Sequence, residues 1–220
     1  MIRSVRIPWA GGEVSGRIAG NGSTGVLLAH GAGTDQDHPF MTELRDQLAS
    51  FGLQVMTFNY PYTERGAKRP DRAERLVECH RGAADFLSER SEWLFLGGRS
   101  MGGRMGTYLA ASGYPCDGIV LYSYPLHPPG KPEKLRVEQF PDIEAPMLFF
   151  QGTRDALSRQ DLFDQHIRPL PNADVVTLEG ASHSTRGGGW TPERMAAFLA
   201  EQTVAWIDGL SSGRTTGQRP

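Results

Sequence analysis

The sequence has little cysteine, little net charge and no long apolar run, and each shortage excludes a class of protein. Its only cysteines, Cys79 and Cys116, are too few for a disulfide framework or for a zinc site of their own. A formal net charge of −2 gives no electrostatic reason to expect a nucleic-acid partner. Apolar runs such as residues 26–29 fall far short of the about 20 residues that span a membrane.

The opening residues and the composition predict a cytoplasmic protein with one main domain. Residues 1–8 lack the apolar segment of a secretory signal. The 27 glycines and 15 prolines are too few to indicate low complexity. The length suits one domain that buries roughly 70% of its extended surface. We therefore expect a domain over residues 1–210 and a polar, flexible tail over residues 211–220.

Short apolar segments alternate with helical patterns along the chain. The segments that predict strands are residues 2–9, 13–19, 25–30, 53–58, 93–96, 118–122, 147–150 and 173–178. The main helical patterns lie around residues 40–48, 71–87, 105–110, 157–167 and 191–210. This alternation predicts an α/β fold, an open and mostly parallel sheet with helices on both faces. The connection over residues 123–146 is too short for a large cap domain, and a ligand site is expected at the carboxyl ends of the strands.

A serine flanked by glycines follows the apolar segment 93–96. The residues Gly98-Arg99-Ser100-Met101-Gly102 form the pattern G-x-S-x-G, and a helical pattern comes next. Such a tight strand-to-helix turn projects the serine hydroxyl from the end of the sheet, because the glycines remove side chains that would collide with strand and helix. The structural alternative is a glycine-rich turn with an incidental serine. The segment lacks the Lys-Ser/Thr pair of a phosphate-binding loop.

A serine nucleophile also needs donors for the oxyanion of the tetrahedral intermediate. We expect one donor to be the backbone amide of Met101, at the start of the following helix. The second is expected to be the amide of Ala32, in the loop that follows the strand over residues 25–30. His30, at the end of that strand, is expected to orient the loop.

The general base must be a histidine that reaches Ser100 from another loop. His183 lies among small residues after the last predicted strand, at the same edge of the sheet. His127 lies in a loop at this edge and is the alternative. Three other histidines fall within or near predicted helices and are expected on the surface or in packing: His38, His80 and His166.

The acid of the site must hold the imidazole in one tautomer and stabilise its protonated form. Asp155 is the first carboxylate after the strand over residues 147–150 and lies at the correct edge. The loop after Tyr122 offers no carboxylate in its first residues. The chain order Ser100, Asp155, His183 is the order of a triad on an α/β-hydrolase sheet.

These features resemble the α/β-hydrolase superfamily over nearly the whole chain. Within it, residues 30–33, 60–62, 97–104 and 151–155 are similar to the Tex30/KANSL3-like group of predicted hydrolases, which is related to the dienelactone hydrolases. The resemblance implies the fold and a Ser-His-Asp triad more firmly than it implies a substrate. The dienelactone enzymes carry a cysteine nucleophile where this chain has Ser100, so their substrate does not transfer.

Residues at the predicted strand ends are candidates to line a substrate pocket. They are His30, Gly31, Gly33, Tyr60, Tyr62, Arg99 and Tyr124. Ordinary core packing is the alternative for the tyrosines. Arg99 either pairs with a carboxylate beneath its loop or meets an acidic substrate.

The sequence therefore predicts a serine hydrolase that cleaves a carboxylic ester, or a thioester or small amide, through an acyl-enzyme. This chemistry needs no cofactor and no metal, and the expected partner is a small-molecule acyl substrate. Acyl transfer to an acceptor other than water uses the same residues and stays open. A non-catalytic protein-interaction module on the same fold is the alternative from another functional class.

Overall fold

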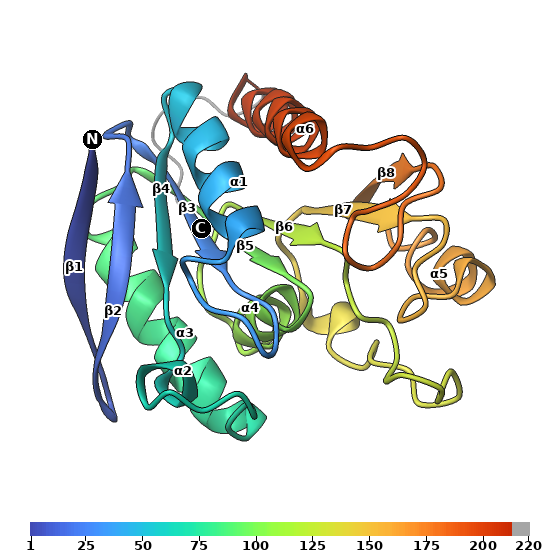
Figure 1. The fold of residues 1–220 in the computed structure, drawn as a ribbon, viewed down its shortest axis with the longest axis horizontal. Coiled ribbons are helices and arrows are strands. Elements are labelled where there is room, and N and C mark those ends of the chain that lie inside the picture. The colour runs from blue at the N-terminus through green and yellow to red at the C-terminus, as the bar shows by residue number, and fades with distance from the viewer. Residues whose placement is uncertain (213–220) are drawn as a thin grey trace.

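The computed structural model describes residues 1–212, and in this part of the chain eight strands form one sheet (Figure 1). The strands are β1 (Ile2–Trp9), β2 (Gly12–Ala19), β3 (Thr24–Ala29), β4 (Gln54–Phe58), β5 (Trp93–Arg99), β6 (Gly118–Tyr122), β7 (Met147–Gly152) and β8 (Ala173–Leu178). Their order across the sheet is β1-β2-β4-β3-β5-β6-β7-β8. The hairpin β1–β2 is antiparallel, as is the pair β2–β4, and all other pairs are parallel. The prediction of an open, mostly parallel sheet is confirmed.

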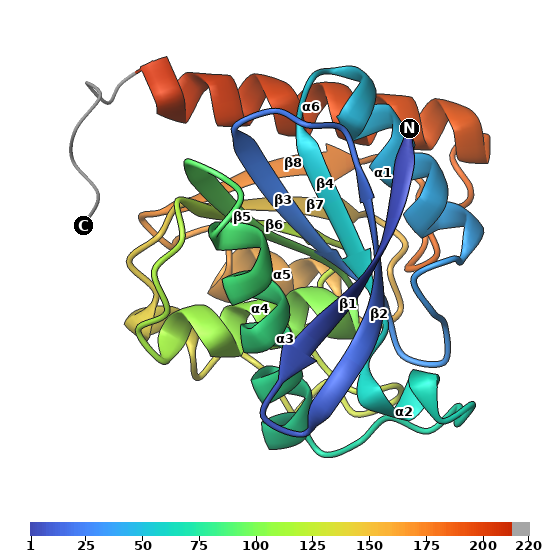
Figure 2. The same cartoon turned by 90° about the vertical axis from the view of Figure 1, so that its left-hand side faces the viewer.

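Helices cover both faces of the sheet (Figure 2). On one face lie α1 (Pro39–Ser50) and α6 (Pro192–Ser212), whose Leu44 and Leu199 belong to one hydrophobic core. On the other face lie α3 (Ala73–Ser88), α4 (Met101–Ala111) and α5 (Gln160–His166), which pack on a second core. In residues 1–212 no large cap domain covers the sheet, and none of their helices combines the length and apolar character needed to cross a membrane.

Strand β3 shows why the sequences of the central strands are continuous apolar runs. Val26 and Leu28 belong to the core under α1 and α6, whereas Leu27 and Ala29 belong to the core under α3 and α4. All four side chains are fully buried. Because successive residues of a strand point to opposite faces, a strand covered on both sides must be apolar at every position.

Three local expectations differ from the structure. The short helix α2 (Pro61–Glu64) stands where a loop was expected, and its proline occupies the first turn, where a missing N–H costs nothing. Helix α5 begins at Gln160 rather than at Leu157. Helix α6 continues to Ser212, so the first two residues of the expected tail are helical, and the rest of that tail lies outside the described residues. The 123–146 connection holds one short 3₁₀ turn, η1 (Phe140–Asp142), and no large cap domain, in agreement with its expected shortness.

A buried histidine on α3 lies between the sheet and its helices. The side chain of His80 is fully buried, and its ring lies 5.5 Å from that of Phe58. The hydroxyl of Tyr60 lies 2.9 Å from its Nδ1, while its Nε2 has no hydrogen-bond partner in residues 1–212. Burial lowers the pKa of His80 to about 3, so the folded protein holds this ring neutral.

Replacement of His80 by glutamine should weaken the dependence of stability on pH. The unfolded chain binds a proton at a histidine with a pKa near 6.5, whereas folded His80 does not, so stability falls as pH drops below about 6.5 toward about 3. At about pH 5 this one group costs about 2 kcal/mol relative to neutral pH. Urea unfolding of wild type and His80→Gln at both pH values measures the difference. Identical pH dependence of the two proteins would contradict the assignment.

Candidate active site

Ser100 occupies a sharp turn between β5 and α4. Its φ of 51° lies in the left-handed region, where a residue other than glycine is strained by about 1–3 kcal/mol. A Cβ atom at Gly98 would collide with the backbone of Gly103, and one at Gly102 with the carbonyl of Ala29. The two glycines therefore allow the close packing of strand and helix that holds Ser100 at the carboxyl edge of the sheet.

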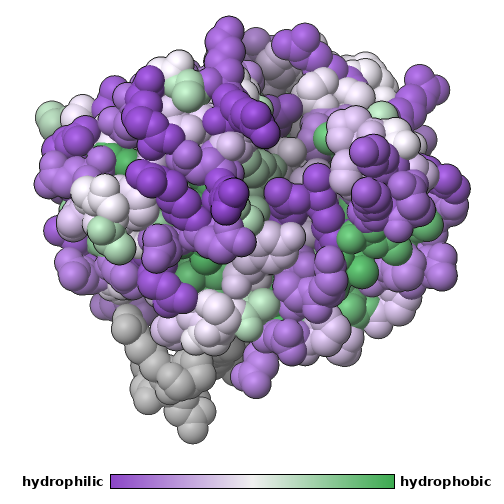
Figure 3. Space-filling model, turned by 90° about the horizontal axis from the view of Figure 1, so that it is seen from below, coloured by the Kyte–Doolittle hydropathy of each residue, from purple (hydrophilic) through white to green (hydrophobic). Residues whose placement is uncertain are grey.

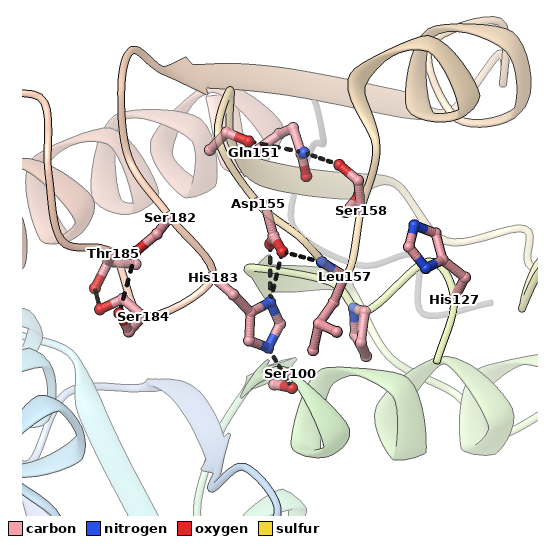
Figure 4. Close-up of polar contacts among 12 residues, drawn as sticks. Ser100, His127, Gln151, Asp155, Leu157, Ser158, Ser182, His183, Ser184 and Thr185 are labelled. Carbon is pink, nitrogen blue, oxygen red and sulfur yellow. Dashed lines mark hydrogen bonds and ion pairs between the residues drawn. The ribbon is translucent and has the colours of Figure 1, made fainter. Parts of the chain in front are cut away.

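His183 lies between Ser100 and Asp155 (Figure 4). Its Nε2 is 2.8 Å from Oγ of Ser100, and its Nδ1 is 2.8 Å and 3.0 Å from the two carboxylate oxygens of Asp155. Because an ionised carboxylate only accepts hydrogen bonds, Nδ1 carries the proton and Nε2 is free to accept one from the serine hydroxyl. The three residues that the sequence predicts to act together thus form one hydrogen-bonded row.

Contacts within its own loop fix the carboxylate of Asp155. Its side chain has no solvent exposure, and the backbone amide of Leu157 donates to Oδ1 at 2.7 Å. The side-chain amide of Gln151 donates to the carbonyl of Ser158 at 2.9 Å and closes the loop. The sequence analysis missed these contacts, although an aspartate that accepts the amide two residues on is a common turn motif. They also explain why α5 begins late: residues 155–158 form a turn around the carboxylate.

The loop that carries His183 is joined to the loop of Asp155. The amide of Arg154 donates to the carbonyl of Ala181 at 2.9 Å, and the amide of Ser182 donates to the carbonyl of Arg186 at 2.8 Å. The His183 side chain is 21% exposed, in contrast to the fully buried carboxylate behind it. A substrate can therefore reach the imidazole while the carboxylate stays shielded from water.

The amides expected to stabilise an oxyanion are both unpaired. In residues 1–212 neither the N–H of Ala32 nor that of Met101 has a hydrogen-bond partner. A Cβ atom at Gly31 would lie 3.6 Å from the Cβ of Ser100, so this loop passes directly beside the serine. Two available donors thus belong to backbone segments that adjoin the hydroxyl.

His30 connects the loop over residues 30–33 to the end of β4. It is fully buried, its Nδ1 lies 2.8 Å from the carbonyl of Gly31, and its Nε2 accepts from the amide of Tyr60 at 3.2 Å. Burial lowers the pKa of His30 to about 4, which keeps the ring neutral. Both ring nitrogens are engaged with the backbone, which agrees with the expectation that His30 orients the loop.

Comparison with known proteins places the chain in a family. The model of the family described as "Alpha/beta hydrolase domain" matches residues 22–208. The chain belongs to this family. The match confirms the superfamily named from the sequence motifs and supports a hydrolase.

Solved structures share the fold of this α/β-hydrolase at low sequence identity. A dienelactone hydrolase from Anabaena variabilis has a TM-score of 0.76 at 20% identity, covering 95% of this chain and 97% of its own. An α/β serine hydrolase without a lid from Xanthomonas campestris has a TM-score of 0.75 at 16% identity, covering 93% and 94%. Est1E from Butyrivibrio proteoclasticus has a TM-score of 0.74 at 12% identity, covering 93% and 99%. At these identities the likeness concerns the fold.

Other residues predicted near the site of this α/β-hydrolase lie in its core. Tyr60 is fully buried, with its ring 5.0 Å from that of Phe58. Tyr124 is 1% exposed and donates from its hydroxyl to the carbonyl of Arg136 at 2.8 Å. For these two tyrosines the packing alternative is the better description. Tyr62 is also buried, but its hydroxyl has no hydrogen-bond partner in residues 1–212.

The alternative base does not reach the serine. His127 is buried, its Nδ1 lies 3.0 Å from the carbonyl of Pro128, and its Nε2 accepts from the amide of Arg159 at 3.3 Å. Figure 4 shows it well apart from the row formed by Ser100, His183 and Asp155. Both ring nitrogens of His127 form hydrogen bonds with loop backbone, so neither is free to take a proton from another group.

One of the two expectations for Arg99 is wrong. In residues 1–212 this arginine forms no ion pair with any carboxylate, so it does not anchor the turn through an acidic residue. The one carboxylate that acts on it, that of Asp155, is engaged by His183 and the amide of Leu157.

Residues 1–212 also contain no group of three His, Cys, Asp or Glu side chains placed to hold a metal ion.

Figure 3 shows the molecule from below the view of Figure 1, which is the side toward which the arrow of β4 points. This side is largely hydrophilic, with smaller hydrophobic areas between the polar side chains.

Replacement of Gly98 by alanine should strongly destabilise the fold. The new Cβ would meet backbone atoms at the turn and at the start of α4, which cannot move without disturbing β5, so we expect a loss of about 2 kcal/mol or more in the free energy of unfolding. Gly209→Ala in α6 is the matched control. Apart from its chain neighbours and the backbone of its own helix, no atom lies within 4 Å of the Cβ it would add, and alanine favours a helix by about 0.5–1 kcal/mol. Urea unfolding that showed the same effect for both variants would contradict the packing argument.

Proposed function

We propose that this α/β-hydrolase is a serine esterase that works through an acyl-enzyme. The observation that carries the proposal is the row of Ser100, His183 and Asp155, with hydrogen bonds of 2.8 Å on both sides of the imidazole. These side chains come from three loops after β5, β7 and β8. A scaffold without catalysis has no packing requirement for such a row, so the arrangement favours an enzyme over an interaction module.

The first half of the reaction forms the acyl-enzyme. Oγ of Ser100 attacks the ester carbonyl carbon while Nε2 of His183 takes the hydroxyl proton. Asp155 stabilises the resulting imidazolium through Nδ1–H. The carbonyl oxygen becomes an oxyanion, which accepts hydrogen bonds from the amides of Ala32 and Met101; one such donor is typically worth about 2.7–4 kcal/mol. The tetrahedral intermediate then collapses, and His183 returns the proton to the departing alkoxide.

The second half releases the acid. His183 takes a proton from a water molecule, and the resulting hydroxide attacks the carbonyl carbon of the acyl group that is bound to Oγ of Ser100. A second tetrahedral intermediate forms on the same two donors, and its collapse gives the carboxylic acid and the free serine, which regains its proton from His183. A thioester or a small amide would follow the same steps.

The narrower group, the cellular location and the partner are part of this proposal. The segments over residues 30–33, 60–62, 97–104 and 151–155 support membership of the Tex30/KANSL3-like group of predicted hydrolases. Both cysteines are free thiols, which suits a reducing compartment such as the cytoplasm. The partner we propose is a small-molecule acyl substrate, and the chemistry requires no cofactor.

A fluorophosphonate probe should label the wild-type protein and should not label Ser100→Ala. The probe reacts with a serine hydroxyl only where a base activates it, and His183 is the one histidine within hydrogen-bond reach of Ser100 in residues 1–212. Labelling is read by intact-protein mass spectrometry, and circular dichroism checks that both proteins are folded. Equal labelling of both would remove Ser100 as the nucleophile.

Substitution of His183 or Asp155 should slow ester hydrolysis by orders of magnitude. With p-nitrophenyl esters of short acids, we expect kcat to fall by roughly a thousandfold or more in His183→Ala and Asp155→Asn, because the serine then lacks a correctly oriented base. His127→Gln is the control, since it alters a buried loop histidine that does not touch Ser100. Loss of activity in His127→Gln, with activity retained in His183→Ala, would reverse the assignment of the base.

A further inference from the structure

Arg99 directly precedes the nucleophile, and in residues 1–212 no carboxylate forms an ion pair with it. Its guanidinium lies over the ring of Phe40 of α1, with Cζ 5.0 Å from the ring centroid. Its Nε is buried and has no hydrogen-bond partner in residues 1–212. The N–H donors of a guanidinium lie in its plane, so contact with a ring leaves them available to a planar acceptor.

The charged groups that act on Arg99 are Arg186 and Asp155. Burial lowers the pKa of Arg99, and the positive charge of Arg186, an exposed residue in the loop after His183, lowers it further. Burial likewise lowers the pKa of His38 at the start of α1, and the charge of Arg99 adds to this effect. Asp155 opposes this effect on Arg99, but its carboxylate is already bonded to His183.

A partly buried guanidinium with an unpartnered donor is unfavourable unless an anion completes the site. Leaving a charged donor without a partner costs several times more than a neutral hydrogen bond contributes. Structural arginines in such positions are therefore normally paired with a carboxylate. Here an unpartnered donor belongs to the residue that directly precedes Ser100 in the chain, and an unpaired charge at that position points to a ligand.

We propose that Arg99 binds a carboxylate on the acyl portion of the substrate. The preferred substrates are then monoesters of dicarboxylic acids, in which one carboxyl is esterified and presented to Ser100 while the other, free carboxylate meets the guanidinium of Arg99. Arginine suits this role because its fork of donors matches the two oxygens of a carboxylate. Arg99 is a specificity-determining residue in this proposal, which rests on the proposed esterase function.

The test compares esters that differ only in this charge. The substrates are the monoethyl esters of succinic, glutaric and adipic acids, and the controls are the corresponding diethyl esters, with release of ethanol as the measurement. In the wild type, kcat/KM for at least one monoester should exceed that of its diester by roughly 10- to 100-fold, as expected for a charge-assisted hydrogen-bonded pair. In Arg99→Gln this ratio should fall to near one, and Arg99→Lys should restore part of it.

Arg3→Gln is the matched control, because it removes one positive charge from an exposed position on the edge strand β1. It should keep the wild-type ratio. A wild-type ratio near one, or an unchanged ratio in Arg99→Gln, would overturn the inference. The esterase function would still stand if the diesters were hydrolysed in a manner that depends on Ser100.

A second measurement needs no turnover and separates the two proposals. Millimolar glutarate should raise the melting temperature of Ser100→Ala, whereas it should not raise that of the double variant Ser100→Ala/Arg99→Gln. Butyrate, which lacks the second carboxylate, should give the smaller shift. An equal shift with glutarate in both variants would overturn the inference whether or not the protein hydrolyses esters.

Discussion

The backbone of Ser100 is held in a conformation that the chain would not adopt by itself, and the rest of the site depends on it. Its amide donates to the carbonyl of Tyr122 at 3.0 Å, and its carbonyl accepts from the amide of Arg104 at 3.1 Å. One bond belongs to the sheet and the other to the first turn of α4. The residue is therefore tied to two rigid elements at once, and these elements supply the free energy that the strained φ angle requires.

Parallel strands bring residues that are distant in the sequence close together in space. β5, β7 and β8 end at the same edge of the sheet, so the loops after them need only a few residues to bring a serine, an aspartate and a histidine together. Solvent exposure falls from the imidazole inward to the carboxylate. The imidazole of His183 is partly exposed, whereas the carboxylate of Asp155 is enclosed and bonded to the backbone amide of Leu157.

The strands and the row of Ser100, Asp155 and His183 were accessible from the sequence because each has a local signal. Buried parallel strands are continuous apolar runs, and polar residues directly after them share an edge of the sheet. The start of α5 was not accessible, since the turn around Asp155 competes with a helix that the apolar periodicity of residues 157–167 equally allows. The surroundings of Arg99 were also hidden, because the side chain it contacts, that of Phe40 in α1, comes from a distant segment of the chain.

The brevity of the segment between β6 and β7 has a kinetic consequence. Within the described residues this connection contains only one short 3₁₀ turn, so nothing of the size of a domain has to swing aside before a molecule enters or departs. Enzymes with closing lids often spend their turnover time on opening. For the esterase proposed above, we therefore expect that no domain-sized lid has to open before the product leaves, and that the side chains around Ser100 select the substrate.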